Sequence, residues 1–269
     1  MGQYSLDRPD EPQEHRRLDL QHEMWLLTFN GELHLSKIPA MKNSILDIGC
    51  GNGVWTQAMA TAHPTSHVTG MDITPPATAQ RSNVKYVQAN AEEPWPFHGQ
   101  FTFIHARMLV AVVRDWPTLL KQCWEHLEPG GRFELSDLVP PVHAAESEWD
   151  NDTSPIIKWA TAVQATWRTE GLDPTVISDL DKTLEQLGFV NITHSRLRWP
   201  VGTWSNDEKE RKIGELCLLN FQRIHESAGH RMLLNKNSNI SEDEARNLSN
   251  DGIKDFTENC CSKRFFFDL

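Results

Sequence analysis

A glycine-rich loop between an apolar segment and a helix-forming segment is the strongest chemical signal in the sequence. In ILDIGCGNGVW, residues 45–55, the apolar run leads directly into Gly49, Cys50, Gly51 and Gly53. Glycines permit positive φ angles and let a ligand lie against the backbone where a Cβ would collide. Such loops lie at the carboxyl edge of a parallel sheet, where ligands bind. The segment therefore predicts a nucleoside-containing ligand held by this loop.

The spacing of the loop separates the candidate ligands. A glycine-rich loop alone fits nicotinamide, flavin and S-adenosylmethionine (SAM) cofactors about equally well. The dinucleotide pattern G-x-G-x-x-G, started at Gly49, would place its last glycine where Val54 stands. Asp47, two residues before the first glycine, would repel a diphosphate and attract the α-ammonium group of methionine. These two features favour SAM.

Polar residues at the ends of the next two expected strands complete a nucleoside site. Asp72 in VTGMDIT is placed to accept both ribose hydroxyls, and Ile73 offers an apolar face for adenine. In QANAEEPWPF, Asn90 and the backbone of Ala91 are placed to read the adenine edge, with Glu92 near the rim. A strand-end aspartate alone is more often a solvated cap. The ribose role of Asp72 therefore depends on the glycine loop before it.

Two of the twelve histidines are candidates for a catalytic base. Methyl transfer from a sulfonium is an in-line displacement with a neutral leaving group, so alignment of the acceptor matters most. A phenol, hydroxyl or ammonium acceptor must also lose a proton, which histidine can take near neutral pH. His105 is expected to end the fourth strand at the cofactor edge, and His22 to lie on an N-terminal helix. An ordinary hydrogen-bonded role is the more frequent one for any single histidine.

Short apolar runs alternate with helical stretches from residue 44 onward, which predicts a parallel sheet with right-handed crossovers. The polar stretch 235–251 has no element assigned to it. The expected strands cover 45–48, 67–71, 84–89, 101–105, 133–135, 190–196 and a last strand within 262–269, and the expected helices cover 54–62, 116–127 and 174–187.

Two segments are expected to cover the ligand. Residues 1–40 read as an arm followed by an amphipathic helix over 14–29, with Gln21 and His22 on its polar side and Trp25 among its apolar residues. This pattern predicts a lid. The alternation lapses over about 138–172, which predicts a tryptophan-containing cap insertion after the fifth strand. The remainder, 41–269, is expected to be one ligand-binding domain that contains this cap.

Composition narrows the class of protein. Acidic residues outnumber basic ones by 37 to 26 and the basic ones are scattered, which disfavours a nucleic-acid partner. Five cysteines without a C-x-x-C pair argue against a disulfide framework and a zinc site. No run reaches the roughly 18 apolar residues of a membrane span, and no secretory signal opens the chain. His105 and Arg107, in place of clustered carboxylates, predict no metal requirement. A cytoplasmic protein is expected, with nuclear residence left open.

With these motifs in place, the chain resembles the Rossmann-like class I methyltransferases, with motif I at LDIGCGNG, motif II at Asp72 and motif III at Asn90-Ala91. It is similar to fungal secondary-metabolism methyltransferases related to the regulator LaeA and to the UMTA-like enzymes, through RLDLQHEMWLLTFNGELHL, MDITP, IHARMLVAVVRDWPTLLKQCWEHLEPGG and RWPVGTW. The resemblance implies an α/β fold with a seven-stranded sheet in the order 3-2-1-4-5-7-6, the last strand antiparallel, and helices on both faces. It implies SAM contacts at Asp47, Gly49, Gly51, Asp72, Ile73, Asn90, Ala91 and the backbone of His105.

Three functions stay open at this point. The first is a SAM-dependent methyltransferase that acts on a small-molecule natural product and releases S-adenosylhomocysteine (SAH). The second is a LaeA-like regulatory or scaffold protein that binds SAM and a protein partner, and the third is a SAM-binding enzyme of a non-methylating, pericyclase-like kind. Asn90 and Thr102 stand where the family commonly has aspartate, which affects turnover more than cofactor binding. The sequence does not decide between a monomer and a homodimer.

Overall fold

The computed structural model describes residues 11–38, 43–77, 79, 81–145, 154–235 and 240–269. They divide into two compact units. The sheet unit consists of residues 29–137 and 176–194, and the helical unit consists of the residues up to 28, 138–175 and 195–269. The arm 1–10 and, within the cap, residues 146–153 lie outside the described residues. The N-terminal helix therefore belongs to the same unit as most of the expected cap.

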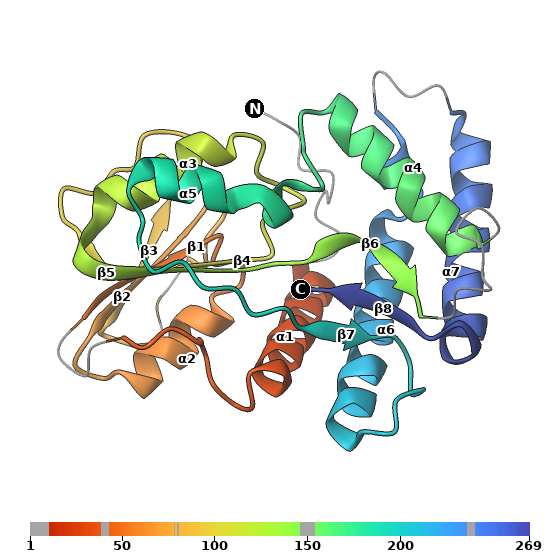
Figure 1. The fold of residues 1–269 in the computed structure, drawn as a ribbon, viewed down its shortest axis with the longest axis horizontal. Helices are drawn as coiled ribbons and strands as arrows, with labels where there is room; N and C mark the ends of the chain where they lie inside the picture. The colour runs from red at the N-terminus through yellow and green to blue at the C-terminus, as the bar shows by residue number, and fades with distance from the viewer. Residues whose placement is uncertain (1–10, 39–42, 78, 80, 146–153, 236–239) are drawn as a thin grey trace. The chain divides into compact units, whose positions relative to one another are not determined.

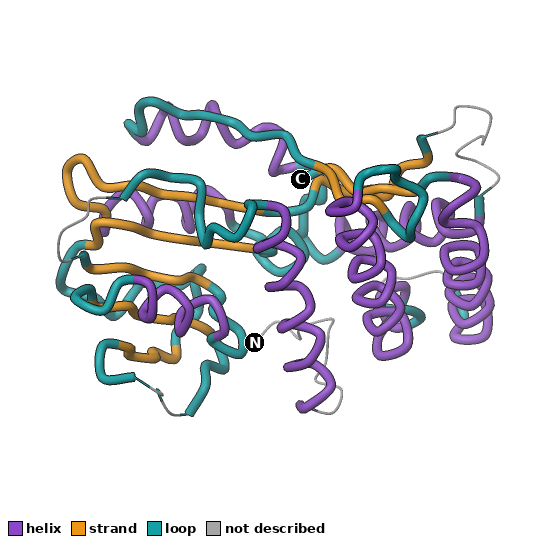
Figure 2. The backbone as a smooth tube through the Cα atoms, turned by 90° about the horizontal axis from the view of Figure 1, so that it is seen from below, coloured by secondary structure: helices purple, strands orange, loops and turns teal. Residues whose placement is uncertain are grey.

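A five-stranded parallel sheet forms the centre of the sheet unit (Figures 1 and 2). Its order, β3-β2-β1-β4-β5, confirms the order expected for the first five strands. The fourth strand runs past His105, and the fifth begins well before residue 133. The strands are β1 (Ser44–Ile48), β2 (His67–Asp72), β3 (Val84–Gln88), β4 (Phe101–Arg107) and β5 (Leu127–Ser136).

Helices cover both faces of this sheet, as Figure 1 shows. Side chains alternate between the faces along a strand. Phe103 accordingly packs with Trp55 of α2 on one face, whereas Ile104 packs with Leu119 of α3 on the other. The expected helix at 174–187 is shorter than predicted, because a 3-10 turn, η1 (Val176–Asp179), precedes it. The helices are α2 (Val54–Ala62), α3 (Trp116–His126) and α5 (Leu180–Leu187).

The helical unit holds the remaining strands in a separate antiparallel sheet of order β6-β8-β7. One continuous seven-stranded sheet is therefore the wrong expectation for the described residues. The structure has no strand at 190–196, where one was expected. This segment is largely solvent-exposed, with Val190 78% exposed, and lacks the buried face of a strand in a sheet. The elements are α1 (Glu11–Thr28), β6 (Val139–Ala144), α4 (Pro155–Thr169), β7 (Arg198–Pro200), α6 (Glu208–Ala228), η2 (Arg231–Leu233), α7 (Glu242–Lys263) and β8 (Phe265–Asp268).

The long helix α7 occupies much of the stretch to which the sequence assigned no element. Ser241 and Glu244 form a capping box at its start, in which each side chain bonds the other's backbone N–H. Phe256 is 2% exposed and stacks on Phe265 of β8, with ring centroids 6.0 Å apart. The polar composition of α7 therefore hides a narrow buried stripe that packs on its neighbours.

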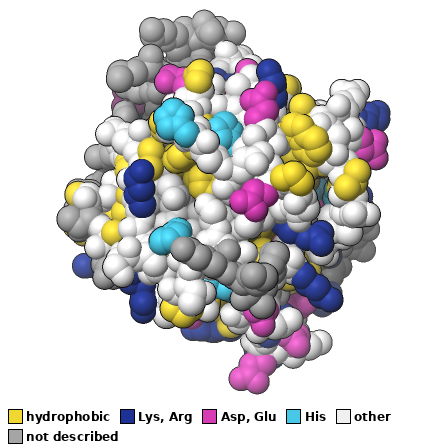
Figure 3. Space-filling model, turned by 90° about the vertical axis from the view of Figure 1, so that its left-hand side faces the viewer, with side chains coloured by type: hydrophobic (Ala, Val, Ile, Leu, Met, Phe, Trp, Pro, Cys, Tyr) yellow, Lys and Arg dark blue, Asp and Glu magenta, His cyan; other side chains and the backbone are white. Residues whose placement is uncertain are grey.

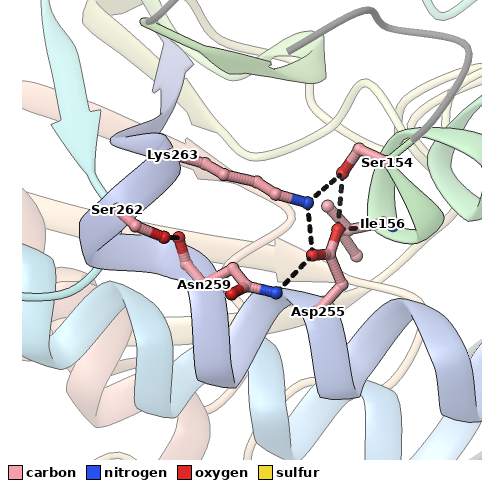
Figure 4. Close-up of polar contacts among 6 residues, drawn as sticks. All are labelled: Ser154, Ile156, Asp255, Asn259, Ser262 and Lys263. Carbon is pink, nitrogen blue, oxygen red and sulfur yellow. Dashed lines mark hydrogen bonds and ion pairs between the residues drawn. The ribbon is translucent and has the colours of Figure 1, made fainter.

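A buried ion pair within α7 is hydrogen-bonded to the start of α4 (Figure 4). Lys263 Nζ lies 2.6 Å from Asp255 Oδ1, and both side chains are less than 10% exposed. Asp255 Oδ2 accepts hydrogen bonds from Ser154 Oγ at 2.5 Å and from the Ile156 N–H at 3.3 Å. Asn259 Nδ2 donates to Asp255 Oδ1 at 2.9 Å. One carboxylate thus caps α4 and neutralises a buried lysine.

One face of the molecule carries mixed charges. On the face in Figure 3, basic, acidic and histidine side chains are interspersed, and no stripe of one sign is seen among the coloured residues. None of the helices within the described ranges is long and apolar enough to span a membrane.

Candidate cofactor site

The glycine loop has the backbone conformation that its composition predicts. Gly49, Gly51 and Gly53 have φ angles of 67°, 54° and 78°, in the left-handed region that favours glycine. The N–H groups of Gly49 and Cys50 both donate to the Met71 carbonyl, at 2.8 and 3.1 Å. The loop is therefore bound to the end of β2, and α2 starts directly after it.

Neighbouring side chains fill the space behind the loop. A Cβ at Gly49 would lie 2.7 Å from Leu109 Cδ2, and one at Gly53 would lie 2.1 Å from Tyr86 Oη. Cys50 is 7% exposed, and burial raises the pKa of its thiol far above the ordinary value. Cys50 accordingly serves as an uncharged side chain of the core. A ligand at this loop would meet backbone atoms rather than the thiol.

Asp72 is bonded to the glycine loop itself. Its Oδ2 accepts a hydrogen bond from the Gly51 N–H at 2.8 Å, and its Oδ1 accepts one from the Thr74 N–H at 2.9 Å. The side chain is half-buried, and Ile73 beside it is 44% exposed. A carboxylate has about four lone-pair positions, so capacity is left for ribose hydroxyls. Asp72 both shapes the loop and leaves acceptor sites for a ligand.

The turn after β3 is braced by its own side chains. Asn90 Oδ1 accepts from the Glu92 N–H at 3.0 Å. The carboxylate of Glu92 accepts from the N–H groups of Arg114 and Asp115, at 2.8 and 2.7 Å. Glu92 therefore holds the loop before α3, a role that the sequence did not predict. The Ala91 carbonyl accepts from the side chains of Trp95 and Gln122, at 3.0 and 2.9 Å.

Asp47 and His105 face each other across neighbouring strands, at matching positions of β1 and β4. Asp47 Oδ1 lies 2.9 Å from His105 Nδ1, and Asp47 Oδ2 accepts from Thr56 Oγ1 at 2.6 Å. Asp47 is 3% exposed and His105 is 1% exposed. The sequence anticipated neither the burial nor these two bonds.

The imidazole of His105 is also stacked on an indole. The ring centroids of His105 and Trp55 are 3.8 Å apart with an angle of 4° between the planes. Burial lowers the pKa of His105, although the hydrogen bond with Asp47 opposes that shift. Burial also lowers the pKa of Arg107, to about 10, and Asp47 again opposes the shift. The expectation that His105 ends its strand is wrong, because β4 continues to Arg107.

Asp137 is a buried residue of the site that sequence reasoning missed. Its Oδ2 accepts from the N–H groups of Leu109 and Val110, at 2.6 and 2.9 Å, and the side chain is 3% exposed. Met108, just before them, has a φ angle of 59°, so the chain turns sharply where β4 ends. An acidic residue directly after the fifth strand was the available signal. Thr102, at the start of β4, bonds the backbone of Ser44 in β1.

His22 and Arg17 belong to the helical unit, where both are buried. Arg17 forms an ion pair with Glu14 and donates to Asn220 Oδ1 of α6 at 3.2 Å. Trp25 of α1 packs edge-on against Trp199 of β7, with centroids 4.8 Å apart. These contacts anchor α1 in the helical unit. The lid role of this helix stays a prediction.

Among the residues that the structure describes, no group of three or more His, Cys, Asp or Glu side chains is arranged to hold a metal ion. The absence of a metal requirement stays a prediction.

A parallel sheet with a glycine loop after its first strand and an acid at the end of its second defines a nucleoside-binding α/β domain of the Rossmann-like kind. The chain matches the family model of a methyltransferase domain over residues 19–194. It belongs to this family of SAM-dependent methyltransferases, as the sequence motifs predicted.

Three fungal proteins are among the relatives of this chain. The chain is 32% identical over 219 residues to Methyltransferase pytC of Aspergillus terreus. The matched region covers 79% of this chain and 66% of that protein. It is 30% identical over 215 residues to Probable methyltransferase tdiE of Emericella nidulans, and this match covers 79% of this chain and 67% of that protein. It is 29% identical over 218 residues to Protein-methionine methyltransferase laeA of Emericella nidulans, but spans only 57% of that protein.

The fold matches a solved structure as well. A putative methyltransferase from Bacillus halodurans superposes with a TM-score of 0.50 at 18% identity, with 93% of this chain and 95% of that chain covered. At this identity the likeness shows a shared fold.

Proposed function

We propose that this protein transfers the methyl group of SAM to a small-molecule natural product and releases SAH. The observation that carries the proposal is the glycine loop, whose positive φ angles and bond to Asp72 form a backbone cradle at the carboxyl edge of the sheet. Similarity to the fungal proteins named methyltransferase pytC and tdiE supports the natural-product part. A cytoplasmic location and the absence of a nucleic-acid substrate belong to the same proposal.

Each part of the cofactor would meet a different part of this site. The methionine end would lie against Asp47 and the loop backbone from Gly49 through Cys50 and Gly51 to Gly53. The ribose would bond to Asp72. Adenine would lie on Ile73, with its edge at Asn90 and Ala91. Glu92 would act at the rim only indirectly, because its carboxylate already holds the backbone before α3.

The chain's own contribution to the reaction would be alignment and exclusion of water. Bound SAM supplies an electrophilic methyl group on a sulfonium, and the leaving group is neutral. The fixed loop would hold the donor in one orientation, so that an acceptor atom can approach in line. Where the acceptor must lose a proton, the sequence by itself offers His105 and His22 as candidates for the base.

One experiment tests this function directly. Purified protein is incubated with methyl-deuterated SAM and extracts of fungal metabolites, and the products are followed by mass spectrometry. A labelled small molecule together with SAH supports the proposal. SAH binding without a labelled metabolite would contradict it.

The second candidate is a regulatory protein, which similarity to laeA of Emericella nidulans favours, since a relative there is named a secondary metabolism regulator. Deuterated methyl label on a protein in the same incubation, or SAH binding with a protein partner and no small-molecule product, would favour this reading. A non-methylating, pericyclase-like reaction would instead show product without any label.

A further inference from the structure

We propose that His105 is a positioning residue of the cofactor site, which acts by holding the Asp47 carboxylate together with Thr56, and not the base that takes a proton from the acceptor. The inference rests on the proposed function, since it takes Asp47 as the carboxylate that faces the methionine end of SAM. It assigns a role to three buried side chains that meet where β1, β4 and α2 come together.

The carboxylate of Asp47 is fixed through both of its oxygens. Thr56 Oγ1 donates to Oδ2 at 2.6 Å, and His105 Nδ1 lies 2.9 Å from Oδ1. A bond to each oxygen from a different element prevents rotation of the carboxylate plane. Thr56 is fully buried, so water cannot replace its hydroxyl. A carboxylate held in this way keeps its remaining lone pairs in a fixed direction for a ligand cation.

The tautomer of His105 follows from this contact. An ionised carboxylate only accepts hydrogen bonds, so the proton of the imidazole must be on Nδ1. Nε2 then carries a lone pair, and this atom is buried without a hydrogen-bond partner among the described residues. A buried unsatisfied acceptor is unfavourable by itself. The position of the ring therefore depends on the contacts of Nδ1 and of the ring face, not on Nε2.

Trp55 supplies that second contact. Its indole lies parallel to the imidazole at 3.8 Å between centroids, and its Nε1 donates to the Leu33 carbonyl at 2.8 Å. Trp55 is 2% exposed and stands in the first turn of α2, directly after the glycine loop. The stack therefore joins His105 to the same helix start that Thr56 occupies. The imidazole of His105 thereby connects strand β4 to the N-terminal end of α2.

The surroundings of His105 do not suit a base. Asp47 and Glu134 favour a proton on the ring, whereas Arg107 and burial disfavour it, and burial has the largest effect on the pKa. The pKa of His105 is consequently below its ordinary value, so a neutral ring is favoured near pH 7. Nε2, the one nitrogen with a free lone pair, has no solvent-accessible surface to offer an acceptor molecule. Both properties fit a fixed hydrogen-bond donor.

Three substitutions of His105 separate the two roles. The amide nitrogen of His105→Asn can reach the position of Nδ1 and donate to Asp47, whereas that of His105→Gln reaches the position of Nε2. His105→Ala donates nothing. The exposed pair of His194 and Asp181 in the same unit, with N and O 2.8 Å apart, provides the control His194→Ala.

Calorimetry with SAH and steady-state kinetics give the readouts. We expect His105→Ala and His105→Gln to weaken SAH binding roughly tenfold or more, since a hydrogen bond to a charged group is lost. His105→Asn should bind SAH within about threefold of the wild type and keep kcat at saturating SAM. His194→Ala should change nothing. Wild-type SAH affinity in His105→Ala, with kcat reduced about a hundredfold or more in both the Ala and the Asn variants, would overturn the inference.

Thr56 provides a second test in case the His105 variants do not fold. Thr56→Val removes the hydroxyl at nearly constant shape and should weaken SAH binding, whereas Thr56→Ser should preserve it. Equal SAH affinity in the wild type, Thr56→Val and Thr56→Ser would contradict the positioning of Asp47. Failure of the wild type to bind SAH would instead contradict the proposed function, so the two failures are distinguishable.

Discussion

Asp137 holds the backbone of Leu109 through a hydrogen bond of 2.6 Å from the Leu109 N–H to Oδ2, although the two residues are 28 positions apart in the chain. The side chain of Leu109 in turn lies against Gly49, where an added Cβ would be 2.7 Å from its Cδ2. A carboxylate after β5 is thereby connected to the first glycine of the loop. We therefore expect the position of the loop to depend on Asp137.

We predict that Asp137→Ala lowers both stability and SAH affinity. Two buried N–H groups would lose their acceptor, at a cost of about 1–3 kcal/mol of unfolding free energy each. Asp137→Asn keeps one carbonyl oxygen and should have the smaller effect on both. Urea denaturation and calorimetry with SAH measure the two quantities. Unchanged SAH affinity in a folded Asp137→Ala variant would show that the loop does not depend on this residue.

Gly51→Val should abolish SAH binding, because valine is strained at a φ angle of 54° and its side chain would project from the loop. The variant Gly130→Ala is the control for backbone strain without a steric collision, since Gly130 has a φ angle of 80° and no heavy atom lies within 4 Å of an added Cβ. The control should lose some stability but keep SAH affinity. Calorimetry on both variants makes the comparison. Retained binding in Gly51→Val would mean that the ligand lies elsewhere.

Asp255→Ala should destabilise the protein by about 3–5 kcal/mol, because Lys263 would stay buried without its carboxylate and α4 would lose its cap. Arg246→Ala removes an exposed pair with Glu242 on the same helix and should cost less than about 1 kcal/mol. Chemical denaturation of both variants tests the contrast between buried and exposed pairs. Similar losses in the two variants would argue against the buried position of Lys263.

The stability of the protein should fall as the pH drops below about 6.5, the ordinary pKa of histidine. Burial lowers the pKa of His225 and of His105 in the folded chain. The unfolded chain then binds protons over this pH range that the folded chain does not, so acid favours unfolding. Thermal melts between pH 8 and roughly pH 5.5 would show the slope. His225→Gln should reduce it, and an unchanged slope would mean that His225 does not contribute.

Local patterns in the sequence predicted the parts of the fold that local physics decides. Strands β1 to β4 and helix α2 could be placed from apolar periodicity, and the positive φ angles of the loop followed from its glycines. Helix α7 was not predicted because its buried stripe, which includes Phe256, is narrow within a polar sequence. The capping-box pattern of Ser241 and Glu244 was the signal in the sequence that could have revealed its start. The separate three-stranded sheet depends on long-range pairing of β8, which no local pattern contains.

For the site, residue types were more accessible than their partners. Asp47 and His105 stand out from the sequence as polar residues in apolar strands, but only their positions opposite each other show that they bond. The bond from Asp137 to the end of β4 likewise joins segments that the chain brings together only after folding. The sequence of a single strand shows which residues could take part in chemistry. Their roles depend on hydrogen-bond partners from other strands, which only the folded structure shows.

The contact between Arg17 and Asn220 has a consequence for biosynthesis. The two residues are 203 positions apart, so α1 is made long before the helix on which it packs. At about 5–20 residues per second, roughly 10–40 seconds of translation separate the two on the ribosome. During that interval Met24 and Trp25, which are 0% and 2% exposed in the finished protein, lack the C-terminal half of the unit that buries them. We expect the apolar side chains of α1 to be accessible to chaperones until α6 has been made.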